Sequence, residues 1–326
     1  MILKNNKSLQ QEIAQEDRRE RGTRHSLILP STYRKNPNFE FIKNNLINSK
    51  LFSDISYQKL PTAKHRQTIK IDDITCVIDG IDSPGIDLDE IRTDKIFKDV
   101  NFIFILQFCA ARAEHYKYIS EKSGIHILPL IYGVSGRFPI GQFNWRKIDH
   151  KYLAHFGFGV SVQKHRKKWI AKAKQNGNFL IDYMRGKRFS NALKDCRWGV
   201  SLKGSGVRHD GKCYREAEFL SCGMPLALDY QPSYAFPFFP NVHYLYLDSL
   251  SMLDKLSEID PEPFANRSKT LWKNHYCPVT FTNLLLAILY DEDYRNSIPS
   301  FWPGNKTTKL DIKLKKIRCR KNGQRR

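Results

Sequence analysis

Residues 197–229 read RWGVSLKGSGVRHDGKCYREAEFLSCGMPLALD, and this stretch gives the clearest succession of structural signals in the chain. The short apolar run Trp198 to Leu202 leads into a glycine-containing loop, which is typical of a buried strand followed by a turn. Apolar residues recur at helical spacing over Lys212 to Cys222, Gly223 stands where a C-terminal cap is expected, and Pro225 to Asp229 is a further strand. The pattern predicts a βαβ unit with two parallel strands.

Such a unit places its loop at the carboxyl edge of the sheet, next to the start of a helix. The free N–H groups and positive potential of a helix N-terminus favour phosphate. Charged side chains gather in and around this loop, and they are the cations Lys203, Arg208, Lys212 and Arg215 and the acids Asp210 and Glu218. The unit therefore offers cations for a diphosphate and carboxylates for the hydroxyl groups of a ribose or a hexose.

The segment REAEFLSCGMP, residues 215–225, resembles the donor-site motif in the C-terminal domain of GT-B glycosyltransferases. That motif is R-x-x-E followed by a small-residue turn, G-x-P and a strand. The segment is most similar to the exostosin-like group, although Cys213 stands where that group has Ser. Asp210 and Glu218 are spaced like the paired acids of retaining GT-B enzymes.

The resemblance implies a nucleotide sugar as the donor substrate, with no metal or other cofactor. It implies that Lys203 and Arg215, together with the glycine loop at Gly204, stabilise the departing diphosphate. Glu218 would then bind the ribose hydroxyls, and Asp210 would contact the donor sugar. The alternative is an ordinary Rossmann-like unit in which Arg215 and Glu218 merely pair on a helix surface.

Arg166 is a further predicted phosphate contact. It stands at the start of a basic helix predicted over His165 to Gln175, after a strand and a glycine-containing turn, and this order also resembles the GT-B donor domain. Cations at a helix N-terminus oppose the helix dipole, so their presence there favours a ligand. A solvated start of a basic helix is the alternative.

Strands and helices also alternate on both sides of the loop-like segment Gly133 to Asp149, which predicts an α/β fold. The resemblance implies two Rossmann-like domains facing a cleft, the GT-B arrangement. We expect an acceptor-side domain over residues 1–140 and a donor domain over residues 141–300, with terminal helices that return to the first domain. Residues 301–326 form a basic C-terminal tail.

Transfer to an acceptor hydroxyl needs a general base. Asp79 and Asp82 follow the predicted strand Ile74 to Asp79 and are the best-placed carboxylates for this role. Both also suit a turn, because Asp is common there beside Gly and Pro. The triplet Asp87-Leu-Asp89 has the form of a metal-binding D-x-D sequence, but its place before a helix predicts an N-terminal cap.

The formal net charge of +21 indicates a polyanionic partner, either an anionic membrane or glycolipid, or DNA. No apolar run reaches the roughly 18 to 20 residues of a membrane span. The seven cysteines include no C-x-x-C pair, which favours a reducing compartment. We expect a cytoplasmic protein that binds the inner membrane face peripherally.

Three functions follow from these observations. The first is a glycosyltransferase acting on a cell-surface glycan or glycolipid of the lipopolysaccharide or polysaccharide type. The second is a transferase acting on hydroxymethylated bases in DNA, as phage enzymes do, with the basic stretch Lys164 to Arg188 and the tail on phosphates. The third is a non-enzymatic nucleic-acid-binding protein with a Rossmann-like core.

Overall fold

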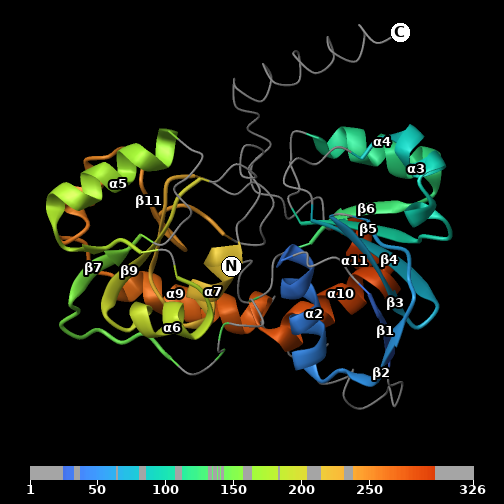
Figure 1. The fold of residues 1–326 in the computed structure, drawn as a ribbon, viewed down its shortest axis with the longest axis horizontal. Helices are drawn as coiled ribbons and strands as arrows, with labels where there is room; N and C mark the ends of the chain where they lie inside the picture. The colour runs from blue at the N-terminus through green and yellow to red at the C-terminus, as the bar shows by residue number, and fades with distance from the viewer. Residues whose placement is uncertain are drawn as a thin grey trace, which may run out of the picture.

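The computed structural model contains two β-sheets, one formed by each half of the chain (Figure 1). Helices flank both sheets, which confirms the α/β fold. The residues that the structure describes are 25–32, 37–63, 65–80, 86–106, 112–130, 134, 138, 140, 143–156, 164–182, 184–203, 214–230 and 238–297.

The first sheet is mixed and has the order β2-β1-β3-β4-β5-β6. Its strands are β1 His25–Pro30, β2 Phe52–Gln58, β3 Arg66–Ile71, β4 Ile74–Asp79, β5 Phe102–Ile105 and β6 His126–Pro129. Strands β1 and β2 are parallel, as are β4, β5 and β6, whereas β3 runs antiparallel to both β1 and β4. Helices α2 Pro37–Ser49, α3 Leu88–Thr93 and α4 Ala113–Ser123, with the short η1 Lys95–Phe97, belong to this half.

The second sheet is entirely parallel and has the order β11-β10-β9-β7-β8. Its strands are β7 Tyr152–His155, β8 Phe179–Leu180, β9 Cys196–Ser201, β10 Leu226–Leu228 and β11 Leu245–Tyr246. The chain passes from β7 outward to β8, returns to β9, and then continues outward to β10 and β11. The strand order therefore reverses between β7 and β9.

Right-handed crossovers place the helices that follow β7 and β9 on opposite faces of this sheet. Helices α5 Lys164–Asn176 and α8 Met252–Lys255 share one apolar cluster. Helices α6 Gly186–Leu193, α7 Tyr214–Ser221 and α9 Glu262–Leu271 cover the other face (Figure 1). Strand alternation matches this division, because Trp198 and Val200 pack with the α5 cluster while Gly199 contacts Phe219 of α7.

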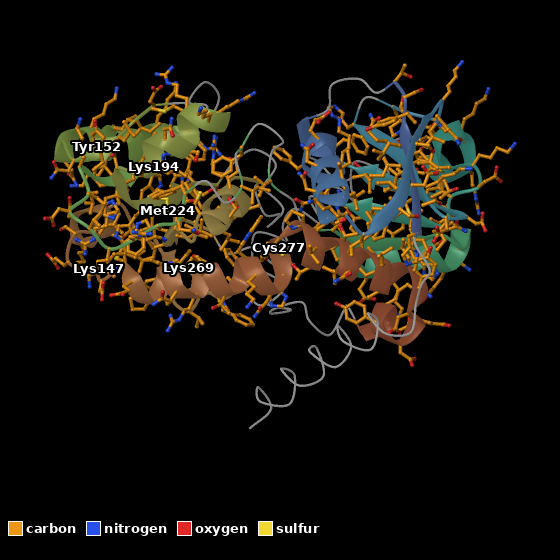
Figure 2. The ribbon with its side chains drawn as sticks, turned by 90° about the horizontal axis from the view of Figure 1, so that it is seen from below. Lys147, Tyr152, Lys194, Met224, Lys269 and Cys277 are labelled. Atoms are coloured by element: carbon orange, nitrogen blue, oxygen red, sulfur yellow. The ribbon has the colours of Figure 1, made fainter. Side chains whose placement is uncertain are left out.

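The last helices join the two halves. Helix α9 packs against α7 and continues through a π-helical turn, Trp272–Tyr276, into α10 Pro278–Tyr290 and α11 Glu292–Ser297. Helix α10 packs against α2. Figure 2 shows Cys277, just before α10, between the two halves. The apolar core of the first sheet is continuous with that of the α7 face, so the expected return of terminal helices to the first half is confirmed.

The end of the predicted connecting loop packs on the second half. The amide N–H of Trp145 donates to the carbonyl oxygen of Cys222 at 2.8 Å, and its indole is buried. Lys147 forms ion pairs with Asp260, at 3.1 Å, and with Glu262, at 3.4 Å. These contacts fix residues 143–150 beside α7 and α9. The domain limits at residues 140 and 300 stay a prediction.

Candidate functional site

The described donor-side residues come from both faces of the second sheet. Ligands of doubly wound sheets bind outside the carboxyl ends of the strands, where the strand order reverses. Arg166 of α5 contacts Leu202 and Lys203 just after β9, whereas Arg215 of α7 pairs with Glu218 and contacts Met184. The predicted residues Gly204 and Asp210 lie outside the described residues, and so does Asp82 in the first half.

Arg166 and Lys203 are in direct contact. The Arg166 Nε–H donates to the Lys203 carbonyl oxygen at 3.2 Å, and Nη2 donates to the Leu202 carbonyl oxygen at 2.9 Å. The Lys203 amide N–H in turn donates to Asp229 Oδ1 at 2.6 Å. The two predicted phosphate contacts are thereby fixed beside each other at the carboxyl end of β9.

Arg215 and Glu218 form a buried ion pair one helical turn apart. Arg215 Nη1 donates to Glu218 Oε2 at 3.0 Å, and their side chains are only 7% and 3% exposed. The Arg215 guanidinium also lies 4.0 Å from the centre of the Phe189 ring. Burial raises the pKa of Glu218 to about 7, although the charge of Arg215 acts to lower it. The pairing expected by the alternative interpretation exists, but inside the protein rather than on its surface.

Two contacts hold α7 close to the sheet. A Cβ on Gly199 would lie 2.7 Å from the Phe219 ring, so this strand position admits no larger residue without a shift. The carboxylate of Glu216 accepts hydrogen bonds from the hydroxyl groups of Ser201 and Tyr230. The helix ends at Ser221, and the φ of 62° at Gly223, just beyond it, confirms the predicted glycine cap.

A histidine and a carboxylate at the same edge were not predicted as site residues. Asp229 had been assigned only as the end of a strand, yet its Oδ2 pairs with Nε2 of His165 on the first turn of α5. Its position follows from strand alternation, because Asp229 and Ala227 share a side and Ala227 packs in the α5 cluster. A polar residue at the carboxyl end of a buried parallel strand is the signal that could have revealed it.

His155 lies on the other face of the same edge, at the end of β7. Its ring centre is 4.9 Å from that of Phe189, in the tilted arrangement. Burial, with the positive charge of Arg215 as the second cause, lowers the pKa of His155 to about 3. The imidazole is therefore neutral at physiological pH and places no second positive charge beside the Arg215 guanidinium.

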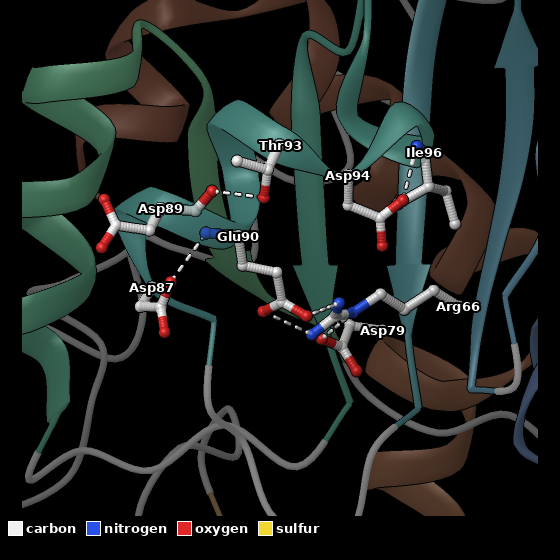
Figure 3. Close-up of polar contacts among 8 residues, drawn as sticks. All are labelled: Arg66, Asp79, Asp87, Asp89, Glu90, Thr93, Asp94 and Ile96. Atoms are coloured by element: carbon white, nitrogen blue, oxygen red, sulfur yellow. Dashed lines mark hydrogen bonds and ion pairs between the residues drawn. The ribbon is translucent and has the colours of Figure 1, made fainter. Parts of the chain in front are cut away.

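The carboxyl edge of the first sheet holds a different arrangement (Figure 3). Asp79 is 1% exposed and accepts a hydrogen bond of 3.0 Å from Arg66 Nε, while both terminal nitrogens of Arg66 bind Glu90. Burial lowers the pKa of Arg66, but the two carboxylates outweigh this effect and leave it raised. An ionised carboxylate in a buried ion pair is a weak base. This geometry favours a role for Asp79 in holding α3 against β3 and β4, and its role as general base stays a prediction.

The triplet Asp87-Leu-Asp89 is confirmed as a helix start. Asp87 Oδ1 accepts a hydrogen bond from the Glu90 amide at 2.7 Å and caps α3 (Figure 3). Within the described residues, no group of three or more His, Cys, Asp or Glu side chains is placed to hold a metal ion. In the same part of the chain, no helix has the length and apolar character needed to cross a membrane.

Comparisons with known proteins add little to this geometry. No family model matches the chain, and no curated protein matches it. A solved structure of accessory secretory protein 1, 2 and 3 in Streptococcus pneumoniae matches with a TM-score of 0.40 and 11% identity, over 65% of this chain and 47% of that one. This chain thus spans about half the length of that relative. A likeness at this level indicates neither a function nor a shared fold.

Proposed function

We propose that this protein is a glycosyltransferase that takes its sugar from a nucleotide-sugar donor. The supporting observation is that Arg166 contacts Lys203 at the carboxyl end of β9, beside the point where the strand order reverses, and that α7, which follows β9, carries the buried Arg215–Glu218 pair. This is the ligand position in doubly wound sheets. The residue types suit a donor with a diphosphate and a ribose.

The residues divide the work of donor binding. Arg166 and Lys203 supply positive charge to the diphosphate from the α5 side, and Arg215 supplies it from the α7 side. Because protein groups fix these cations before the reaction, they stabilise the charge that develops on the leaving diphosphate without reorganising. Glu218 accepts hydrogen bonds from the ribose hydroxyls, and Asp210 contacts the sugar.

The GT-B arrangement, with an exostosin-like donor half, is the fold that we assign to this activity. The first half would supply the acceptor side and the general base, with Asp82 or Asp79 in that role. The helices α9 and α10, which run from α7 to α2, support this assignment because they join the donor half to the acceptor half. A Lewis acid is not required, since fixed cations carry the charge.

The test is hydrolysis or transfer from a panel of nucleotide sugars that covers the common bases and hexoses. Wild-type protein is expected to turn over at least one member. Arg215→Ala is expected to lower kcat/KM by at least about 100-fold, as for a lost group that stabilises developing negative charge. Glu218→Ala is expected to lower kcat/KM because the ribose loses its hydrogen-bond acceptor. Lys194→Gln is the control, because Lys194 is exposed and precedes β9 at the opposite edge of the sheet (Figure 2). No turnover of any donor, or unchanged turnover by both variants, would refute the proposal.

For the acceptor, we propose a glycan or glycolipid at an anionic membrane surface. Helix α5 exposes Lys167, Lys168 and Lys174 and contains no acidic residue, which suits a surface of anionic lipid. The stretch Lys164 to Arg188, expected to contact phosphates if DNA were the acceptor, divides between α5 and α6 on opposite faces of the sheet (Figure 1). This division favours the membrane over a duplex.

Cosedimentation distinguishes these two acceptors. We expect binding to vesicles that contain phosphatidylglycerol and none to vesicles of phosphatidylcholine alone. Duplex DNA that binds more tightly than the anionic vesicles, with a steep dependence of log K on log salt concentration, would instead favour the transferase acting on DNA.

A further inference from the structure

The pair formed by His165 and Asp229 has no role in the donor site proposed above. Asp229 is 1% exposed, and both of its carboxylate oxygens are engaged, Oδ1 by the Lys203 amide and Oδ2 by His165 Nε2. The His165 side chain is 49% exposed. A buried acid therefore holds a half-exposed imidazole, whereas both partners of an ordinary surface ion pair are exposed.

Asp229 constrains the imidazole of His165 chemically as well as spatially. Because Asp229 occupies Nε2, that nitrogen carries a proton, and the other ring nitrogen, Nδ1, remains for a second partner. A carboxylate in this position fixes the orientation of the ring. The ring of His165 also lies edge-on to Trp169, with 6.3 Å between the ring centres.

The surroundings of His165 indicate an anion as its second partner. Arg166 is the next residue and is fixed on the carbonyl oxygens of Leu202 and Lys203. The segment from residue 164 to residue 181 contains no Asp or Glu. Basic side chains at the carboxyl edge of a parallel sheet suit the phosphates of a nucleotide.

We propose that His165, positioned by Asp229, binds the diphosphate of the donor and stabilises the charge that develops on it. This role rests on the proposed glycosyltransferase function. In the transfer, the acceptor oxygen forms a bond to the anomeric carbon while the bond from that carbon to the phosphate oxygen breaks. The electron pair of the broken bond stays on the leaving diphosphate, and His165, in the form that carries a proton on each ring nitrogen, donates a hydrogen bond to it from Nδ1. Asp229 is the positioning residue.

Calorimetric titration with UDP, GDP, ADP, TDP and inorganic pyrophosphate tests this role, and the parent nucleosides serve as uncharged probes. His165→Gln is expected to weaken binding of the preferred diphosphate and of pyrophosphate about tenfold and to leave nucleoside binding unchanged. Asp229→Asn keeps an acceptor for the Lys203 amide but removes the charge behind His165, so a smaller loss of about threefold is expected. Lys194→Gln, the charge-matched control, is expected to bind like wild type.

A spectroscopic readout separates direct contact from a structural role. In nitrogen-15 spectra of histidine-labelled protein, pyrophosphate is expected to shift the Nδ1 signal of His165, and a nucleoside is not. If wild-type protein binds none of the diphosphates, the glycosyltransferase proposal fails and the role of His165 fails with it. If diphosphates bind, and His165→Gln binds them as tightly as wild type or Lys194→Gln weakens them equally, the role of His165 alone is refuted.

Discussion

The carboxyl edges of the two sheets carry different arrangements of charged side chains. On the first sheet, Arg66 lies between Asp79 and Glu90, so one cation faces two acids. On the second sheet, Arg166 and Lys203 lie beside Asp229 at the end of β9, and Arg215 lies with Glu216 and Glu218 on α7. The first edge thus surrounds one cation with acids, whereas the second distributes its cations over both faces of the sheet. We place the donor at the second edge because of this arrangement of cations.

Removing the central cation of the first edge should have the largest effect. Arg66→Met leaves Asp79 and Glu90 without their shared partner, and Asp79 is buried. Breaking a buried ion pair in this way is expected to lower the free energy of unfolding by about 3 to 5 kcal/mol. Urea denaturation at pH 7 measures it. Glu90→Gln, at the partly exposed end of the network, should lower the free energy of unfolding by less. A loss of unfolding free energy below about 1 kcal/mol for Arg66→Met would show that this network does not hold the first edge.

The Arg215–Glu218 pair of the second half should make the free energy of unfolding depend on pH. The folded-state pKa of Glu218, about 7, lies above its ordinary value of 4.5. Between these two values the folded protein holds a proton that the unfolded chain has lost, so stability falls as the pH rises through this window, by up to about 1.4 kcal/mol per pH unit. Glu218→Gln should remove this slope, measured by urea denaturation from pH 4.5 to pH 8. An equal slope in both proteins would contradict the burial of an ionisable Glu218.

Removing Arg215 should extend the fall of the unfolding free energy with rising pH to higher pH values. In Arg215→Met the buried carboxylate of Glu218 has lost its counter-ion, so its pKa rises further. The expected loss of stability is about 3 kcal/mol at pH 8.5 and clearly less at pH 5.5, where Glu218 is protonated. The same denaturation series measures it. The double variant Arg215→Met/Glu218→Gln should recover part of the loss, and no recovery would mean that Arg215 acts mainly through Phe189.

The approach of α7 to the second sheet should depend on Gly199. In Gly199→Ala the new methyl group would lie 2.7 Å from the Phe219 ring, and both residues are part of packed structure. Overpacking of this kind is expected to cost about 1 to 3 kcal/mol in unfolding free energy. Adding Phe219→Leu should relieve part of this cost, as thermal denaturation would show. A Gly199→Ala variant as stable as wild type would refute the close approach.

The contact of Tyr290, at the end of α10, with Asp72 of the first half should give the smallest effect. Partial burial raises the pKa of Asp72, but hydrogen bonds from His25, Tyr290 and Ser26 outweigh this and lower it to about 2. The stability that the ionised Asp72 contributes is present above the ordinary pKa of 3.8 and is lost as the pH falls toward 2. Tyr290→Phe removes one of the hydrogen bonds and is expected to cost about 1 kcal/mol at pH 7. Chemical denaturation measures this loss of unfolding free energy. If Tyr290→Phe lowers the unfolding free energy as much at pH 2 as at pH 7, Asp72 is not the partner of Tyr290.

Much of the fold was predictable because its apolar strands and helices are continuous in sequence. The strands β4 and β9 and the helix α5 are predicted within a few residues of their observed limits. Strands β2 and β3 were not predicted. Strand β2 is polar because it lies at the edge of the sheet and is partly exposed, and β3 carries Arg66, whose charge is satisfied by Asp79 from a neighbouring strand. Pairing across strands cannot be seen in a local pattern.

The candidate site was predictable only in part, for a similar reason. Arg166 and Lys203 were chosen from separate local patterns, and the structure brings them into contact. The pair of His165 and Asp229 joins residues that are 64 positions apart, and neither residue has a distinctive local context. Their contact depends on the strand order and on which face α5 covers. The site thus combines predictable motifs with contacts that only the topology creates.

Amide hydrogen exchange in the presence of a nucleoside diphosphate tests the central claim most directly, because it reports on both sheet edges in one experiment. If the second edge binds the donor, exchange slows in peptides that cover residues 164–170, 198–203 and 214–221 when the preferred diphosphate is added. Peptides covering β4 and α3, residues 74–93, should exchange at unchanged rates. Protection confined to the first sheet, or no protection anywhere at saturating concentrations of every nucleoside diphosphate, would contradict the assignment of the second edge as the donor site.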